Sequence, residues 1–318
     1  MEVISNTDLE VLTKLAQTAF GAINGAVTEL ETGEQGNSGA QLRYFQAGEH
    51  KFVAKHATLL ERRIMNLLQD QDQAVPRLAA GTGADSRDWM VLEFADEIPG
   101  QDNEDPSWAE KLGVALAGIH AQNMGKRPEW LKQLSTDNEL SDVYCHEWQP
   151  LFQNLLQADA AFSARQSDKV DKLDASWEDF KTALAREMED TSRLTLISTD
   201  LTPSHWRHIH GKPVLIDWEQ SRFGPLYLDL PNIFNDKTIG AYYKALASRG
   251  VNIPVDEFSA KFVSLSRYLG FRYMSVGLSG WPDGKNLRLG EDYWQKSGKR
   301  FFELCLEVAL HGYPKPEL

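Results

Sequence analysis

The sequence changes character once, near residues 97–106, and this change limits the folds open to it. Before this point, short β-prone stretches alternate with helical ones, whereas most of the later chain has apolar residues at helical spacing. The 318 residues suffice for two domains, at roughly 150 residues each. We therefore expect an α+β fold with a small lobe over residues 1–98 and a larger, mainly helical lobe over residues 99–318.

Periodicity in the small lobe predicts an antiparallel sheet accompanied by helices. Apolar residues recur every three or four positions over Asp8–Phe20 and Thr58–Gln69, which indicates helices. β-prone stretches separated by turns predict strands, the first three of them a meander. These strands are expected over residues 26–30, 40–46, 50–56, 75–80 and 89–94.

Composition excludes several classes of function. The 33 basic and 46 acidic residues give a net charge of −13, the wrong sign for following a phosphate backbone, so we expect no nucleic-acid partner. The acidic surface either favours solubility or attracts a cationic substrate. Cys145 and Cys305 lack disulfide or zinc-site spacing and are expected to be buried. Without a signal peptide, a membrane-spanning run or a heptad pattern, the sequence predicts a cytoplasmic monomer with no membrane partner.

Two aspartates that follow apolar strands give the strongest functional signal. The expected strands, Leu194–Ser198 and Pro213–Ile216, are followed by Asp200 and Asp217. A hairpin that turns at Gly211 would bring both carboxylates to one side of the fold. Phosphoryl transfer uses one carboxylate beside the attacking hydroxyl and another that holds magnesium. An aspartate after a strand also caps turns, and this alternative stays open for each one.

A lysine in the small lobe is an independent sign of phosphate binding. Lys55 ends the apolar run Phe52-Val53-Ala54, where a lysine can pair with the α- and β-phosphates of a nucleotide. The alternative is an ordinary charge at the edge of a sheet. Glu61 lies near the start of the next helix, where a glutamate complements the helix dipole.

These motifs resemble the aminoglycoside phosphotransferase family, which includes choline, homoserine and fructosamine kinases. In that family HGDxxxxN precedes a strand that ends in IDW or IDF. The matching residues here are Ser198-Thr199-Asp200 through His205, Ile216-Asp217-Trp218, Gly224-Pro225 and Asp229-Leu230. The resemblance implies a two-lobed, protein-kinase-like fold in which a small antiparallel-sheet lobe carries one helix and the other lobe is larger and mainly helical.

The same resemblance implies where ATP and Mg²⁺ bind. Asp200 would be the catalytic base and Asp217 a magnesium ligand, while Asp229 would brace the catalytic loop. Glu61 would orient Lys55 by an ion pair. Asn37 and Ser38 would lie in the turn that covers the phosphates, unless that turn is a plain hairpin turn. The backbone of Glu93, Phe94 and Ala95 would contact adenine, although a buried strand gives the same pattern. His120 is expected to be structural.

Two departures from the family pattern matter for the chemistry: Ser198 replaces its histidine and His205 replaces its metal-binding asparagine. Imidazole nitrogen is a softer ligand than an amide oxygen, and magnesium rarely favours it. His205 is therefore expected to contact the metal, to donate a hydrogen bond to a phosphate or to Asp200, or simply to pack.

The leading hypothesis is an ATP-dependent kinase that phosphorylates a hydroxyl of a small metabolite or antibiotic. One alternative is a nucleotide-binding pseudokinase with impaired turnover, and another is a helical adaptor that binds no nucleotide. The acceptor depends on the second lobe, where aromatic and acidic residues either hold an ammonium group or serve only packing and solvation. These residues are Trp281, Asp283, Glu291, Asp292, Tyr293 and Trp294.

Overall fold

The computed structural model describes most of the chain, in two compact units. The described residues are 6–21, 23, 27–30, 41–83, 87–99, 106–135, 148–231, 236–279 and 299–318. The first unit comprises residues 1–122, 198–221 and 241–250, and the second comprises residues 123–197, 222–240 and 251–318. The lobe boundary expected at residues 98 and 99 lies within the first unit and stays a prediction.

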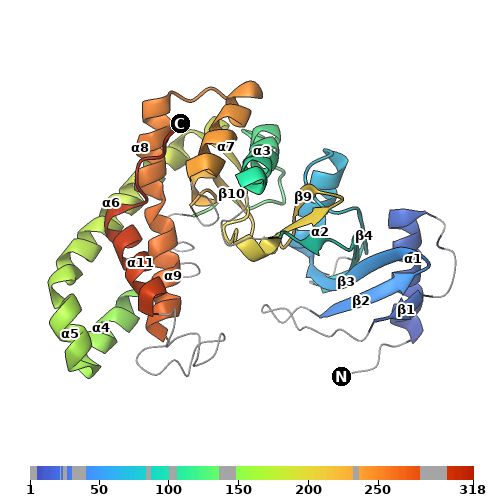
Figure 1. Ribbon diagram of the computed structural model, residues 1–318, viewed down its shortest axis with the longest axis horizontal. Coiled ribbons are helices and arrows are strands. Elements are labelled where there is room, and N and C mark those ends of the chain that lie inside the picture. Colours follow the sequence, from blue (N-terminus) through green and yellow to red (C-terminus); the bar gives the residue numbers. More distant parts are fainter. Residues whose placement is uncertain are drawn as a thin grey trace. The chain divides into compact units, whose positions relative to one another are not determined.

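A five-stranded antiparallel sheet dominates the first unit (Figure 1). Its strand order is β1-β2-β3-β5-β4, so the first three strands form the expected meander. The bounds are Val27–Glu29 for β1, Leu42–Ala47 for β2, His50–Thr58 for β3, Leu78–Ala80 for β4 and Arg87–Glu93 for β5. All five strands predicted from the sequence are present, with ends that differ by a few residues.

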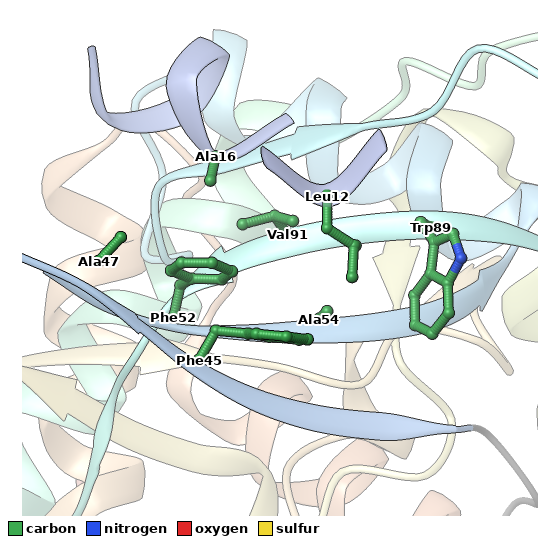
Figure 2. Close-up of a cluster of buried hydrophobic side chains, with 8 residues drawn as sticks. All are labelled: Leu12, Ala16, Phe45, Ala47, Phe52, Ala54, Trp89 and Val91. Carbon is green, nitrogen blue, oxygen red and sulfur yellow. The ribbon is translucent and has the colours of Figure 1, made fainter. Parts of the chain in front are cut away.

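Alternation along β3 gives the sheet two different faces. Phe52 and Ala54 are fully buried on the face covered by α1 (Asn6–Phe20), where they meet Leu12 and Ala16 (Figure 2). Lys55 points to the opposite face because successive side chains of a strand alternate. The strand thus serves a hydrophobic core and a polar site at once.

Helix α2 (Leu59–Asp70) begins directly after β3, as the sequence predicts. The hydroxyl of Thr58 accepts a hydrogen bond from the Glu61 N–H at 3.2 Å and caps the helix. Ile64, Met65 and Leu68 bury the apolar side of α2. The short connection therefore fixes Glu61, one turn into α2, close to the end of β3.

A second, three-stranded sheet in the first unit has the order β6-β8-β9, with bounds Asp96–Glu97, Trp206–Ile209 and Lys212–Leu215. The β8–β9 hairpin turns at His210 and Gly211, with φ of 50° and 75°. Two central residues with positive φ are typical of a tight hairpin turn. This confirms the hairpin predicted from the sequence.

Helices α3 (Pro106–Asn123) and α7 (Asp236–Ser248) meet at His120, whose Nδ1 lies 2.7 Å from the Tyr242 hydroxyl. His120 is fully buried. A buried histidine with this partner agrees with the structural role expected for it.

The second unit is mainly helical. It contains α4 (Trp148–Ala158), α5 (Ala160–Gln166), α6 (Val170–Glu189), α8 (Val255–Leu265), α9 (Arg267–Ser279) and α11 (Lys299–His311). Its two-stranded sheet pairs β7 (Leu194–Ile197) with β10 (Arg222–Pro225). Short 3-10 helices cover Ser167–Lys169, Thr191–Arg193 and Leu226–Leu228 in this unit, and Pro203–His205 in the first unit. None of the described helices is long and apolar enough to span a membrane.

Close packing of α9 on α11 requires Gly270, because a Cβ there would lie 2.2 Å from the Ala309 backbone nitrogen. Nearby, Trp148, Trp177 and Phe271 form an aromatic core, with ring centroids 4.9 to 6.2 Å apart. The second unit thus has a core of its own, as a separate layer of helices requires.

Candidate functional site

Lys55 lies between two carboxylates of the first unit. Its Nζ donates to Glu61 Oε1 at 2.7 Å and to Asp217 Oδ1 at 2.9 Å, and the residue is only 7% exposed. Burial by itself would lower the pKa of Lys55, but the two carboxylates outweigh burial and hold this pKa above its ordinary value. The lysine is therefore a permanently charged, oriented cation rather than a solvated charge at a sheet edge.

Glu61 makes the ion pair expected from the sequence. With Thr58 it has the spacing of a capping box, in which the glutamate would reach back to the N-cap N–H. Its Oε1 instead accepts from Lys55, and Oε2 is buried without a hydrogen-bond partner among the described residues. Burial raises the pKa of Glu61 above its ordinary value, although Lys55 opposes this shift. Such a costly placement indicates a role beyond helix capping.

Asp217 follows β9 in a strained backbone conformation, with φ of 65°. Trp218 anchors this turn: it is fully buried, its Nε1 donates to Leu215 O at 3.3 Å, and its carbonyl accepts from the Ser221 hydroxyl at 2.7 Å. Burial alone would raise the pKa of Asp217, but Lys55, and then His205, hold it below its ordinary value. The carboxylate therefore stays ionised.

His205 lies beside Asp217, with Nε2 3.6 Å from Asp217 Oδ2. It closes the 3-10 helix Pro203–His205, and its carbonyl accepts from the Ile216 N–H at 3.0 Å. Its Nδ1 is buried without a hydrogen-bond partner among the described residues. The sequence left three roles open for His205. Its position beside Asp217 favours contact with the metal or with a phosphate.

Asp200 belongs to the same unit, in the loop between β7 and the 3-10 helix, and is partly exposed. The preceding residue, Thr199, has φ of 62°, and its hydroxyl donates to Gln220 O at 2.9 Å. This bond ties the loop of Asp200 to the loop that follows Asp217. The position corresponds to glycine in the HGD motif, and a β-branched residue with positive φ is strained there.

A third carboxylate near Asp217 was not assigned from the sequence. Oxygens of Glu61, Asp217 and Glu219 all lie within 4.8 Å of one another. Glu219 follows Asp217 by two residues, which is the signal that could have found it. Glu61 is buried, whereas Asp217 and Glu219 are partly exposed, so the donor set that fits a magnesium ion is Asp217 and Glu219, with His205 as a nitrogen neighbour.

The three expected adenine contacts differ in what their backbones can offer. The Glu93 N–H donates to Arg77 O at 2.8 Å, and the Phe94 N–H donates to Lys51 O at 3.1 Å. The Ala95 N–H has no hydrogen-bond acceptor among the described residues. Ala95 is therefore the better candidate donor to adenine, whereas the side chain of Glu93 pairs with Arg77 at 2.9 and 3.2 Å.

Several predicted residues stay untested. Asn37, Ser38, Cys145 and the aromatic–acidic segment from Trp281 to Trp294 lie outside the described residues. Asp229 is fully buried in the second unit, and its role as a brace of the catalytic loop stays a prediction. Cys305 is buried, as the sequence predicts.

Solved structures with similar folds come from enzymes that phosphorylate small molecules. A spectinomycin phosphotransferase, determined with ADP and spectinomycin, matches with a TM-score of 0.60 and 12% identity, over 97% of this chain and 98% of that one. Choline kinase from Cryptosporidium parvum Iowa II matches with a TM-score of 0.59 and 12% identity, over 96% of each chain. Plasmodium vivax ethanolamine kinase matches with a TM-score of 0.54 and 13% identity, over 89% of this chain and 82% of that one.

These likenesses confirm the expected protein-kinase-like fold. Among curated protein sequences, none matches this chain significantly. The sequence model of the phosphotransferase enzyme family matches residues 37–255, which is more than half of the chain. This range contains Lys55, Glu61, Asp200 and Asp217, the residues on which the resemblance depends. The chain therefore belongs to the phosphotransferase enzyme family.

Proposed function

We propose that this chain is an ATP-dependent small-molecule kinase, which transfers the γ-phosphoryl group of ATP to a hydroxyl of a metabolite or antibiotic. Family membership supports phosphotransferase chemistry. The observation that carries the proposal is the position of Lys55, 2.7 Å from Glu61 Oε1 and 2.9 Å from Asp217 Oδ1. Kinases of this fold use such a lysine–glutamate pair to hold the nucleotide phosphates.

Lys55 is suited to bind the α- and β-phosphates. An ammonium group has three N–H donors, and Glu61 and Asp217 accept from two of them. The third donor is available to a phosphate oxygen, and the raised pKa of Lys55 keeps the charge in place. The ADP bound to the similar spectinomycin phosphotransferase supports an adenine nucleotide as the ligand.

The metal-binding side of the site is formed by Asp217, Glu219 and His205. Carboxylate oxygens are the ligands that magnesium prefers, and the depressed pKa of Asp217 keeps its carboxylate ionised. A bound magnesium ion would neutralise charge on the phosphates as it develops during transfer. Asp217 and Glu219 would hold the ion, and His205 would complete the site or contact a phosphate.

Asp200 is the proposed base. The acceptor hydroxyl oxygen attacks the γ-phosphorus, and its proton passes to the Asp200 carboxylate. The bond between the γ-phosphorus and the oxygen that bridges to the β-phosphate breaks, and ADP leaves with that oxygen. Positioning and charge neutralisation supply most of the catalysis in such reactions, so the fixed loops around Asp200 and Asp217 are the main contribution of the protein.

Two measurements test the proposal in sequence. Binding of ADP and GDP with Mg²⁺ is measured first by calorimetry on the wild type and on Lys55→Met. ADP release is then followed by a coupled assay with hydroxyl-bearing acceptors, starting with spectinomycin, choline and ethanolamine. We expect ADP binding that weakens in Lys55→Met, and acceptor-dependent ADP release from at least one compound of a wider hydroxyl library.

Asp200→Asn is the matched control, because it keeps the size of the side chain and removes the base. We expect it to bind ADP like the wild type and to turn over about 10²–10⁴-fold more slowly. Equal turnover in Asp200→Asn would show that the base is another group. Failure of the wild type to bind any nucleotide at millimolar concentration would overturn the kinase proposal as a whole.

A further inference from the structure

A cavity of the first unit lies outside the Lys55 site. Its volume is about 720 Å³, within the range of pockets that hold small organic ligands. It is bounded by the loop after α2, by α3, by the β8–β9 hairpin and by Arg249 at the end of α7. Lys55, Asp217, Phe94 and Ala95 do not line it, whereas the Glu93 side chain does.

Basic residues from separate elements line this cavity. Lys111 comes from α3, Lys212 from β9 and Arg249 from the end of α7, and none of the three pairs with a carboxylate among the described residues. Arg77 also lines the cavity, but its charge is matched by Glu93 through two hydrogen bonds. Lys111, Lys212 and Arg249 are exposed, so their charges are available to a ligand in a chain whose net charge is −13.

Two of these cations are held in place by their surroundings. Lys111 Nζ lies 4.5 Å from the centroid of the Trp108 ring and donates to Gly211 O at 3.4 Å. Arg249 Nη1 donates to Ala245 O at 3.1 Å. A Cβ at Gly118 would lie 3.6 Å from Arg249 Nη2, so the guanidinium lies against α3 at this glycine.

The remaining wall of the cavity is largely apolar, with Val75, Val114, Ile209 and Val214 among its side chains. Asp72, also on the wall, makes no ion pair with these cations. An apolar wall with clustered cations is complementary to a ligand that has an apolar body and a doubly charged anionic group. Guanidinium and ammonium groups from several elements of one wall suit a phosphate dianion better than a singly charged carboxylate.

We propose that this cavity is an accessory binding site for a phosphate monoester with an apolar or planar body, bound by Lys111, Lys212 and Arg249. The site is distinct from the proposed ATP site and does not depend on the proposed kinase activity. It adds a second small-molecule site to the first unit, next to the strand that ends in Glu93.

Naphthyl phosphate is a suitable probe, because it combines a planar apolar body with a phosphate dianion. Its binding is measured by calorimetry on the full chain in the presence of saturating ADP and Mg²⁺, which occupy the proposed ATP site. We expect one binding site per chain under these conditions. Naphthol, which lacks the phosphate, and naphthoate, which carries a single charge, are expected to bind about tenfold more weakly or worse.

The variant Lys212→Gln/Arg249→Gln removes two charges from exposed positions, so the fold is expected to be retained. We expect its dissociation constant for naphthyl phosphate to rise about tenfold or more, equivalent to the loss of about one charge-assisted contact. Lys244→Gln is the matched control, because Lys244 is exposed on α7 but does not line the cavity. Both variants should bind ADP like the wild type.

Three results would overturn this assignment. Loss of naphthyl phosphate binding when ADP saturates the protein would place the probe in the nucleotide site. Equal affinity in the double variant and in Lys244→Gln would show that the cavity cations do not bind it. Naphthol or naphthoate binding as tightly as naphthyl phosphate would exclude a site for phosphate monoesters.

Discussion

The two faces of strand β3 bury different kinds of side chain, apolar on one face and charged on the other. On the face toward α1, Phe52 is fully buried against Phe45, with ring centroids 5.3 Å apart (Figure 2). On the other face, Lys55 and Glu61 are almost as well buried, but both carry charge. One strand of nine residues therefore supports a hydrophobic core and an ionic centre.

This difference between apolar and ionic burial indicates which face stabilises the fold. Apolar burial contributes about 25 cal/mol per Å² and needs no special partner geometry. Burying an ion pair instead exchanges solvation for Coulomb attraction, and the balance is often close to zero or unfavourable. The apolar face therefore supplies stability, whereas the ionic face is explained by what Lys55 and Asp217 can bind.

Truncation of Phe52 to alanine gives the largest expected effect. It leaves a cavity between Phe45, Leu12 and Val91, and removal of a buried phenylalanine costs about 4 kcal/mol. The free energy of unfolding is measured by urea denaturation. Val11→Ala is the control, since Val11 belongs to α1 but is 37% exposed and should change stability by less than about 0.5 kcal/mol. Similar losses in both variants would contradict the assignment of this face as the core.

Replacement of Lys55 by methionine tests the ionic face. The variant leaves the buried Glu61 carboxyl group without its partner, which we expect to cost about 3 kcal/mol in urea denaturation. The double variant Lys55→Met/Glu61→Leu removes the stranded carboxyl group and should regain most of this loss. ADP binding, measured by calorimetry, should stay weak in both variants. Recovery of stability together with ADP affinity would show that Lys55 does not bind phosphate.

The sequence predicts the two faces of β3 better than it predicts their distant partners. Alternation around Phe52 and Lys55 is local, so periodicity alone finds it. Lys55 and Asp217 are 162 positions apart, and only the resemblance to a known motif connected them. Glu219 was not predicted as a site residue, because its position beside Asp217 depends on how the loop after β9 folds.

The short strands β6 and β10 were also missed. Asp96–Glu97 has two exposed acidic residues, and Arg222–Pro225 contains glycine and proline, so neither segment has a strand-like pattern. Their pairing partners, β8 and β7, are set by tertiary structure. A Cβ at Gly224 in β10 would lie 2.7 Å from Ile197 Cδ1, so a larger residue there would displace that side chain. Such a contact cannot be inferred from local sequence.

Cys305 differs from Lys55 and Glu61, because it is an ionisable group buried without a counter-charge. Burial raises its pKa from 9.0 to about 12. The folded state therefore keeps the thiol proton above pH 9.0 while the unfolded state releases it, so stability falls as pH rises from 9.0 toward the folded value. By about pH 10.5 this linkage should remove about 2 kcal/mol.

The pH effect is isolated by comparing the wild type with Cys305→Ala. The variant lacks the titrating thiol, so the difference between the two free energies of unfolding should be constant below pH 9.0 and should shrink above it. Urea denaturation at a series of pH values measures this difference. A constant difference up to about pH 10.5 would mean that the thiol ionises as readily in the folded protein as in the unfolded chain.

Substitutions of Thr199 have the smallest expected effect on the free energy of unfolding. They test the loops that carry Asp200 and Asp217. Its φ of 62° is strained for a β-branched residue, and its hydroxyl donates to Gln220 O at 2.9 Å. Thr199→Ala and Thr199→Gly both lose this hydrogen bond, but only glycine relieves the backbone. We expect the glycine variant to be about 1 kcal/mol more stable than the alanine variant in urea denaturation.

The hydrogen bond of Thr199 is tested separately by Thr199→Ser, which keeps the hydroxyl and should stay within about 0.5 kcal/mol of the wild type. Because the bond joins the loop of Asp200 to the loop after Asp217, we expect turnover to fall in the alanine and glycine variants and to survive in serine. ADP affinity should change little, since Lys55 is untouched. Equal stability of the alanine and glycine variants would mean that the strained backbone is relieved elsewhere, and the site would then tolerate any small residue before Asp200.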